Sequence, residues 1–185
     1  LISTSVGDKF VKGIYQKVAE IDNDRNQIFV AFENMYRASS TSSNKVEKLN
    51  SNLEVIDAVV DKIVPPQITD SLSVTVEKYG SIILDDLKHK PLNESDIITY
   101  RDYEVEFIKK LWLLNGLHLK LAYYGLSKDI HYIHEIFEDD EHKSYAIDAL
   151  EALTNAFVSQ TDYKEDLTEF KKSILERFSQ PAIKD

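Results

Sequence analysis

Three histidines and two glutamates form the pattern in this sequence that could most readily do chemistry. His131, His134, Glu135, Glu138 and His142 are three, four and seven positions apart, so one continuous helix would place them on one face. Imidazole and carboxylate groups bind zinc and iron. However, the order is not His-Glu-x-x-His, and the helix is expected to end near Glu138. A solvated helix face is therefore the preferred interpretation. A metal-binding helical bundle or metal-dependent enzyme using His131, His134 and Glu138, with His142 as a further ligand, is the alternative.

The acidic run from Glu138 to His142 could also be a calcium loop, because Ca²⁺ takes six to eight oxygen ligands. It lacks the alternating acids and the central glycine of an EF-hand loop. Acids at a helix start stabilise the helix dipole, and Asp139 or Asp140 can cap the helix that follows. The structural role is therefore the preferred interpretation.

Other chemistries leave no motif in the sequence. There is no cysteine, which excludes thiolate metal sites and cysteine nucleophiles. The nucleophile elbow Gly-x-Ser-x-Gly and the phosphate-binding glycine motifs are also absent. The sequence therefore predicts no catalytic residue, no cofactor and no enzymatic activity.

Charge is concentrated in one region of the chain. The net charge is −10, and residues 135–169 hold eleven acids against two lysines. This balance disfavours nucleic acid and anionic membranes as partners. The predicted partner is a protein with a basic surface, and the predicted binding surface consists of Glu135, Glu138, Asp139, Asp140, Glu141, Asp148 and Glu151.

The elements that must position these residues are all expected to be helices. Only five glycines and four prolines interrupt the chain, and apolar residues recur three and four positions apart. The predicted fold is all-α, with about seven to nine helices. Helices are expected within 8–38, over 46–63 up to Pro65-Pro66, over 67–88, 97–124 and 126–138, from 140 to 157, and from Thr161 or Asp162 to Phe178. The helix over 97–124 is expected to be the most buried, although Lys109, Lys110, Asn115, His118 and Lys120 interrupt it too often for a membrane span.

Short helices that each have one apolar stripe are typical of stacked helix pairs. The tetrapeptide at Ile56 resembles the one at Ile147, 91 positions later. The favoured architecture is one domain over 1–185 of stacked antiparallel helix pairs, a HEAT-like αα superhelix. An irregular helical bundle is the alternative.

Residues Tyr145 to Leu153, YAIDALEAL, follow a short helix and an acidic turn, and this arrangement resembles a HEAT-type repeat. In particular, it resembles the helical-repeat domains attached to bacterial membrane transporters of the ATP/ADP-translocase kind. The resemblance covers Leu111 to Phe157 and lacks the turn proline and the arginine of many such repeats. It implies a cytosolic regulatory or docking domain, and it carries over no catalytic residue.

The function expected from the sequence is therefore a non-catalytic helical-repeat domain for protein binding, scaffolding or regulation. The resemblance implies that this domain is the soluble, cytoplasmic part of a membrane transporter. No stretch of about 18 uncharged apolar residues occurs, so no direct membrane insertion is expected. Because the chain starts at Leu1 without a methionine, it is expected to be a fragment of a longer protein. A third hypothesis is a ligand sensor with a pocket beside Trp112.

Overall fold

A computed structural model describes residues 1–21, 25–44, 46, 52–64, 73–74, 76–86 and 90–182. The chain divides into two compact units. Unit 1 comprises residues 1–61 and 80–107, and unit 2 comprises residues 62–79 and 108–185. The prediction of one domain over 1–185 stays a prediction.

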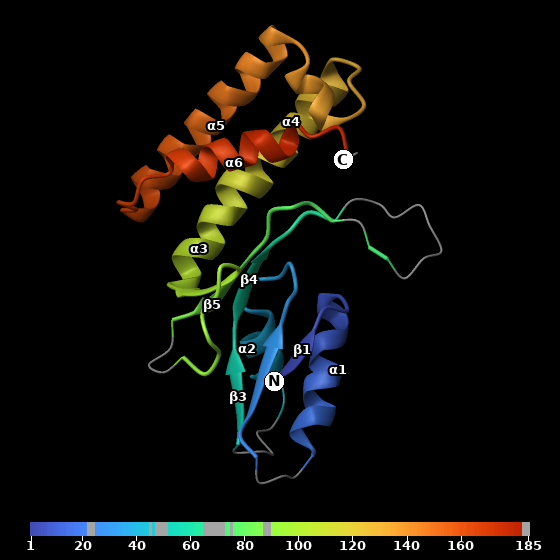
Figure 1. Cartoon of the computed structure of the whole chain (residues 1–185), viewed down its shortest axis with the longest axis vertical. Coiled ribbons are helices and arrows are strands. Elements are labelled where there is room, and N and C mark those ends of the chain that lie inside the picture. Colours follow the sequence, from blue (N-terminus) through green and yellow to red (C-terminus); the bar gives the residue numbers. More distant parts are fainter. Residues whose placement is uncertain are drawn as a thin grey trace. The chain divides into compact units, whose positions relative to one another are not determined.

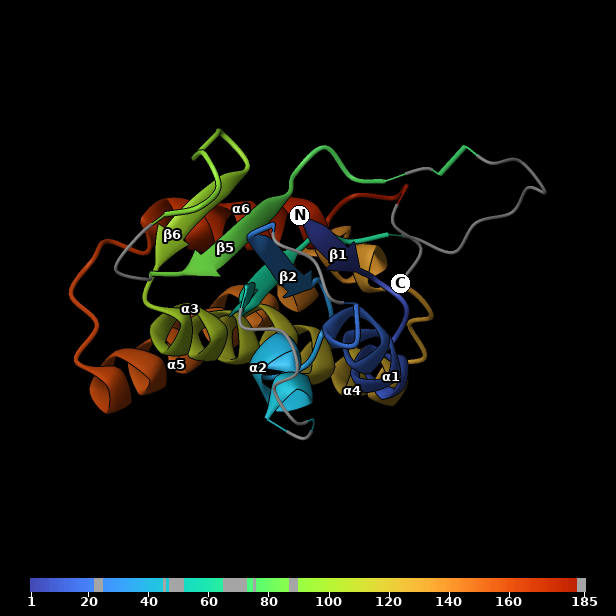
Figure 2. The ribbon, with the colours of Figure 1, turned by 90° about the horizontal axis from the view of Figure 1, so that it is seen from below.

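The first sheet of unit 1 is parallel. It has the order β1-β2-β3, formed by β1 (Ile2–Thr4), β2 (Gln27–Ala31) and β3 (Leu53–Ile56). Helix α1 (Asp8–Ala19) connects β1 to β2, and α2 (Ala38–Ser43) lies between β2 and β3 in the chain. Parallel neighbours need such crossover connections. Figures 1 and 2 show both helices on the same face of the sheet. A shared apolar core joins them to the strands, formed by Val11, Tyr15, Ala19, Phe29, Ala31, Ala38 and Leu53.

The second sheet of unit 1 is mixed and has the order β4-β5-β6. Strand β4 (Ala58–Asp61) runs antiparallel to β5 (Ser81–Asp85), which runs parallel to β6 (Ile98–Arg101). A single residue, Asp57, separates β3 from β4, so the chain passes from one sheet to the other there. Val30 and Ile56 of the first sheet share a core with Ala58, Leu84 and Tyr100.

Unit 2 is helical. Its main elements are the π-helical segment η1 (Lys110–Asn115), α4 (Gly116–Ser127), the 3₁₀ helix η2 (Ile133–Phe137), α5 (Asp140–Thr161) and α6 (Thr168–Phe178). Helix α3 (Tyr103–Lys109) leads directly into η1, and the boundary between the units falls after Phe107. The core contains Leu113, Leu117, Leu121, Ile136, Leu150, Phe157 and Ile174, each 0–1% exposed.

The all-α prediction is wrong, because strands occupy several ranges where helices were expected. The range 46–63 contains β3 and β4, and the range 67–88 contains β5. A strand buried on both faces is a continuous apolar run, which cannot be distinguished from a buried helix by periodicity. Val55, Ile56, Val59 and Val60 are β-branched, a composition that favours strands. Pro65-Pro66 and residues 67–72 lie outside the described residues.

Both predicted helical architectures, the stacked pairs and the irregular bundle, are wrong for the chain as a whole. Several predicted helices are nevertheless present. The helix predicted from Asp8 is α1, and the range 97–124 contains the run from α3 to α4. The helix predicted from Asp140 is α5, and the one that ends at Phe178 is α6. Strand β2 lies within the predicted helical range 8–38, and β6 lies near the start of 97–124. Among the described residues, no helix is both long and apolar enough to cross a membrane.

Candidate functional site

The structure does not assemble the predicted histidine and carboxylate stripe. His131 precedes η2, His134 lies within it, and Glu138 follows it, whereas His142 lies in α5. Within the described ranges, no group of three or more His, Asp or Glu side chains is placed to hold a metal ion. The Glu135 carboxylate instead accepts hydrogen bonds from the backbone N–H groups of His131 and Tyr132, at 3.1 and 3.0 Å.

The imidazole of His142 has a structural partner. Its Nδ1 lies 2.8 Å from the hydroxyl oxygen of Tyr124, whose ring stacks on that of Tyr145 with centroids 3.8 Å apart. Asp139 caps α5 by accepting the N–H groups of Glu141 and His142, as predicted. The backbone bond from His142 lowers the pKa of the Asp139 carboxyl, because it stabilises the charged form.

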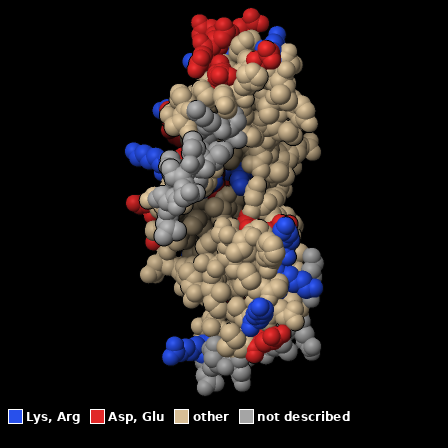
Figure 3. Space-filling view, turned by 90° about the vertical axis from the view of Figure 1, so that its right-hand side faces the viewer, with Lys and Arg blue, Asp and Glu red and all other residues tan. Residues whose placement is uncertain are grey.

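The predicted acidic surface lies at and after the start of α5. Figure 3 shows acidic side chains gathered over this end of the helical unit. Glu138, Asp139, Asp140, Glu141, Asp148 and Glu151 are exposed and Glu135 is half-buried. Glu151 forms an ion pair with Lys171 of α6. A protein partner with a basic surface stays a prediction for this surface.

A second group of polar residues lies at the carboxyl edge of the parallel sheet in unit 1. In parallel α/β sheets, ligands bind outside the carboxyl ends of the strands. Here Ser5, Val6 and Gly7 follow β1. Glu33 and Asn34 lie just beyond β2, separated from its end by one residue. The Glu33 carboxylate accepts the N–H groups of Val6 and Gly7 at 2.7 and 3.1 Å. The hydroxyl of Thr4, at the end of β1, is buried and has no described hydrogen-bond partner.

An arginine connects three carboxylates at the same edge. The Arg37 guanidinium lies 3.1 Å from Asp57, 3.2 Å from Asp85 and 2.7 Å from Glu104. Asp57 follows β3, Asp85 is the last residue of β5, and Glu104 lies in the first turn of α3. The arginine therefore links elements that are far apart in the sequence. The Arg37 backbone is left-handed, with φ 46°, and its N–H donates to the hydroxyl of Tyr103 at 2.7 Å.

These contacts move the pKa values of Arg37 and Tyr103. Burial alone would lower the pKa of Arg37, but its hydrogen bonds to Glu104 and Tyr36 and the charge of Glu104 together raise it. Arg37 is therefore a fixed cation. Burial raises the pKa of Tyr103 to about 12, although the N–H of Arg37 and its positive charge oppose the rise.

Unit 2 contains a distinctive backbone feature in η1. Hydrogen bonds in a π-helix join residues five apart, and such segments occur frequently at functional sites. The N–H of Gly116 donates to the carbonyl of Leu111, five residues earlier. A Cβ at position 116 would lie 3.4 Å from that oxygen, so glycine fits the wide turn with least crowding.

The π-helical segment and the start of α4 contain polar side chains that could take part in proton transfer. Lys110 and Asn115 are five residues apart, the separation that hydrogen bonds span in a π-helix. His118 follows Asn115 by three residues, the spacing of neighbours on an α-helical face. All three are half-buried. We call Lys110, Asn115 and His118 the η1 triad.

The neighbouring lysine has a different role. The ammonium group of Lys109 lies 5.4 Å from the ring centroid of Tyr163 and 5.1 Å from that of Phe170, over aromatic side chains of the helical core. The His118 ring lies 5.6 Å from that of Phe178 and borders an apolar hollow of about 290 Å³ beside α4. Lys109 is thus engaged in packing, whereas Lys110 belongs to the triad.

Neither group of residues was predicted from the sequence. Lys110, Asn115 and His118 were noted only as interruptions of an apolar helix, because a spacing of five is not a face of an α-helix. The polar residues at positions 110, 115 and 118 were nevertheless a usable signal within so apolar a stretch. Glu33 and Arg37 were placed in a helix, where they had no recognisable partners.

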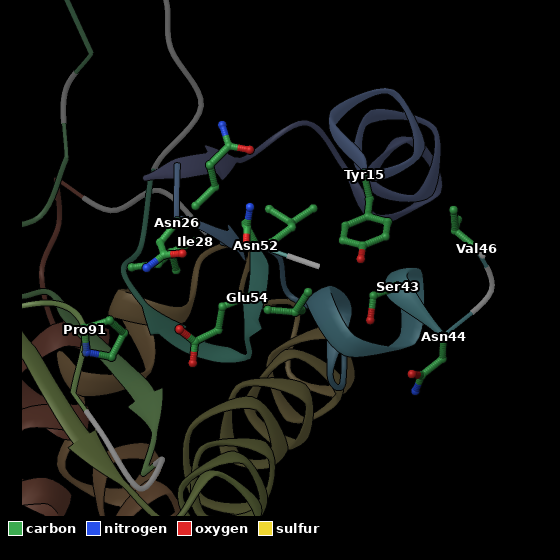
Figure 4. A pocket seen from close by; sticks show the side chains of 12 residues that line it. Tyr15, Asn26, Ile28, Ser43, Asn44, Val46, Asn52, Glu54 and Pro91 are labelled. Atoms are coloured by element: carbon green, nitrogen blue, oxygen red, sulfur yellow. The ribbon is translucent and has the colours of Figure 1, made fainter. Parts of the chain in front are cut away.

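A hollow of about 840 Å³ opens at the opposite end of the parallel sheet, where β2 and β3 begin. Figure 4 shows the Tyr15 and Ser43 hydroxyls and the Asn26, Asn44 and Asn52 amides around it. Residues 22–24, 45 and 47–51, close in the sequence to residues that line it, lie outside the described residues. No site is therefore assigned to it.

Comparison with known proteins adds a family and a set of relatives. Residues 103–185 match the model of the mannitol dehydrogenase C-terminal domain. The mannitol-1-phosphate 5-dehydrogenase of Mycoplasma pneumoniae is 26% identical over the whole chain, which covers 51% of that protein. The enzyme of the same name from Mycoplasmopsis pulmonis is 33% identical over 76% of the chain and 38% of its own length. The one from Thermoanaerobacter pseudethanolicus is 28% identical over the whole chain and 53% of its own length.

These similarities overturn the functional predictions made from the sequence. The relatives are dehydrogenases, so the interpretations as a non-catalytic repeat domain, a transporter-attached domain and a metal-dependent enzyme are wrong. The prediction that the chain is not an enzyme is wrong for the same reason. The chain spans about half the length of these relatives. Its similarity is to a dehydrogenase, and the part from Tyr103 onward resembles the C-terminal domain of mannitol dehydrogenases.

Proposed function

We propose that this chain is part of a dehydrogenase that oxidises mannitol 1-phosphate, or a closely related sugar-alcohol phosphate, at carbon 5. The observation that carries the proposal is its similarity along the whole chain to mannitol-1-phosphate 5-dehydrogenases. In the oxidation, the carbon loses a hydride and its hydroxyl loses a proton, which leaves a ketone. The enzyme therefore needs a hydride acceptor and a proton acceptor.

A nicotinamide dinucleotide is the proposed hydride acceptor, and when bound its ring supplies that chemistry. Unit 1 offers a place for such a group, because three parallel strands end at one edge, where ligands bind in parallel α/β folds, and a turn follows β1. Gly7 has φ 90° in this turn, and the buried Thr4 hydroxyl at the same edge lacks a described partner. This proposal replaces the expectation of no cofactor.

The η1 triad is proposed to handle the proton. Lys110 and His118 each have a nitrogen that can accept a proton, and the Asn115 amide can donate a hydrogen bond to the reacting oxygen and accept one from it. The spacing of these residues across the π-helical turn supports a shared face. No step requires a metal ion, and the triad contains no carboxylate ligand.

The test is an assay of the complete protein with mannitol 1-phosphate and an oxidised nicotinamide cofactor, following absorbance of the reduced cofactor. Unphosphorylated mannitol serves as the comparison substrate. Turnover that requires the phosphorylated substrate supports the proposal. Absence of turnover with the oxidised nicotinamide cofactor rejects it. The cytoplasm remains the proposed location, which cell fractionation checks.

A further inference from the structure

His118 has open space beside it in unit 2. Its side chain is half-buried in the first turn of α4, and it borders the hollow of about 290 Å³. The other residues around this hollow are mostly apolar and come from α4 and from the segment through η2, among them Leu121, Gly125 and Ile136. A histidine ring has no sharp preference in its second side-chain torsion. A packing contact is therefore required to keep the imidazole in one orientation.

Phe178 supplies such a contact from α6. The ring centroids of His118 and Phe178 are 5.6 Å apart, and the ring planes are inclined by 54°. This separation lies within the range that aromatic pairs adopt in protein interiors. Phe178 is the last residue of α6 and is 5% exposed, in the same core as Leu117 and Leu121 of α4. The phenyl ring therefore limits how far the imidazole can turn.

The end of α6 is itself held in place. Arg177, the neighbour of Phe178, donates from Nε and Nη2 to the buried carboxylate of Glu77. The same carboxylate accepts the backbone N–H of Ile63. In the first turn of α6, Lys171 forms an ion pair with Glu151 of α5. Because α6 is attached near both of its ends, Phe178 is a fixed support for the His118 ring.

We propose that Phe178 is a positioning residue that holds the His118 imidazole in the orientation needed for proton transfer. A proton acceptor must lie within hydrogen-bond reach of the reacting hydroxyl, and the two ring nitrogens of a histidine are not equivalent. Phe178 has no group that accepts a proton, so it acts only through His118. The part of His118 in the reaction rests on the proposed function, whereas the contact between the two rings rests on the structure alone.

The first test is the mannitol 1-phosphate assay of the complete protein with substitutions at Phe178. Phe178→Leu keeps an apolar side chain but removes the ring. It is expected to lower kcat about tenfold and to change KM by less than about twofold, because a displaced catalytic group costs rate. Phe178→Tyr keeps the ring and is expected to retain kcat within about threefold. A loss in Phe178→Tyr as large as that in Phe178→Leu would overturn the proposal.

The matched control is Phe170→Leu. Phe170 is an aromatic residue of the same helix that packs against the same core, but its ring lies under the ammonium group of Lys109 rather than beside His118. This variant loses the same volume as Phe178→Leu and is expected to keep kcat within about threefold. An equal fall in kcat in both leucine variants would show that damage to the core, and not the orientation of His118, lowers the rate.

A double-mutant cycle separates positioning from a general effect on the fold. Two residues of which one acts through the other have non-additive effects. In the His118→Gln background, Phe178→Leu is expected to lower kcat by no more than about twofold, because no imidazole is left to orient. An equal loss in both backgrounds would overturn the proposal, and so would an unchanged kcat in Phe178→Leu alone. Phe178→Met replaces Phe178→Leu in the cycle if the leucine variant does not fold.

A spectrum recorded without substrate separates this inference from the proposed function. The complete protein is labelled with ¹³C-histidine, of which this chain contributes five residues, and His118→Gln identifies the His118 ring signal. Because a phenyl ring shifts the resonances of nuclei beside it, this signal is expected to move in Phe178→Leu and to stay in place in Phe170→Leu. Absence of turnover in the unchanged protein would reject the proposed function. Full turnover with an unmoved His118 signal in Phe178→Leu would reject this inference alone.

Discussion

Arg177 of α6 and Glu77, one hundred positions earlier in the chain, form a buried bidentate ion pair in unit 2. The guanidinium donates from Nε and Nη2 to the two carboxylate oxygens at 2.9 and 2.8 Å, and both side chains are only 5–6% exposed. Glu77 also accepts the N–H of Ile63, and the guanidinium lies over the Tyr79 ring at 4.4 Å. This pair therefore fastens the segments around residues 63 and 77 to the last helix.

Removing one member of this pair should destabilise the protein strongly. Arg177→Met or Glu77→Gln leaves the other member buried without its partner, a loss of about 3 kcal/mol in the free energy of unfolding. The double variant Glu77→Leu with Arg177→Met should lose less than either single change, because no uncompensated charge remains. Urea unfolding measures all three. Lys172→Met, which breaks an exposed pair with Glu176, is the control and should change stability by at most about 0.5 kcal/mol.

The Arg37 contacts predict a second stability effect. Arg37→Lys should cost about 2 kcal/mol, because an ammonium group cannot make the directed contacts of a guanidinium to several acids. In this variant the buried Asp57 carboxylate, 3% exposed, loses its contact with the guanidinium. It still accepts the backbone N–H of Ser40. Urea unfolding compares this variant with Arg25→Lys, a change at an exposed arginine. Equal stability of the two variants would contradict a structural role for the Arg37 contacts.

The raised pKa of Tyr103 predicts that the protein loses stability in alkali. Its pKa is raised to about 12 in the folded state, above the ordinary value of 10. Above pH 10 the unfolded chain loses this proton while the folded chain retains it, so stability falls as pH rises from 10 toward 12. Tyr103→Phe removes this contribution and should reduce the fall. Unfolding curves between pH 9 and 11.5 check it, and identical slopes for both proteins would contradict it.

The lowered pKa of Asp139 predicts that the protein loses stability as the pH falls into the acid range. The His142 N–H lowers the pKa of this carboxyl in the folded state, so its stabilising effect is present above the unfolded value. The effect is lost as the pH falls through the lowered folded value. Asp139→Asn still caps α5 but does not titrate, so its melting temperature should fall less between pH 5 and 2. Asp148→Asn, an exposed change within the same helix, should melt like the unchanged protein over this range.

The η1 triad predicts the kinetic consequences of three substitutions. If Lys110 or His118 accepts the proton, Lys110→Met or His118→Gln should lower kcat by about 10²- to 10⁴-fold. Asn115→Ala should reduce kcat by a smaller factor. Lys109→Met, on the adjacent but differently packed residue, is the matched control and should keep kcat within a few fold. Loss of activity in the control alone would contradict the choice of Lys110, and pH–rate profiles assign the proton acceptor.

The sequence by itself predicted the helical elements that have a local signature. Asp139 or Asp140 was predicted to cap the helix that is now α5, because an acid before an apolar helical pattern is a local feature, and Asp139 is the cap. Most of the helix predicted over 97–124 is also present, as the run from α3 to α4, because apolar residues recur there at nearly helical spacing. The segment from Val55 to Val60 was misassigned, because a doubly buried strand has the same continuous apolar character as a buried helix.

Only the tertiary structure decided which distant residues meet. Glu33 reaches Gly7 across 26 positions, and Arg37 reaches Glu104 across 67. Such contacts depend on strand pairing, and pairing depends on long-range packing that a single sequence does not encode in any local pattern. The η1 triad depended on a π-helical turn, which changes the spacing that defines a face. The sequence therefore determined the chemistry available, and the fold decided which residues share a site.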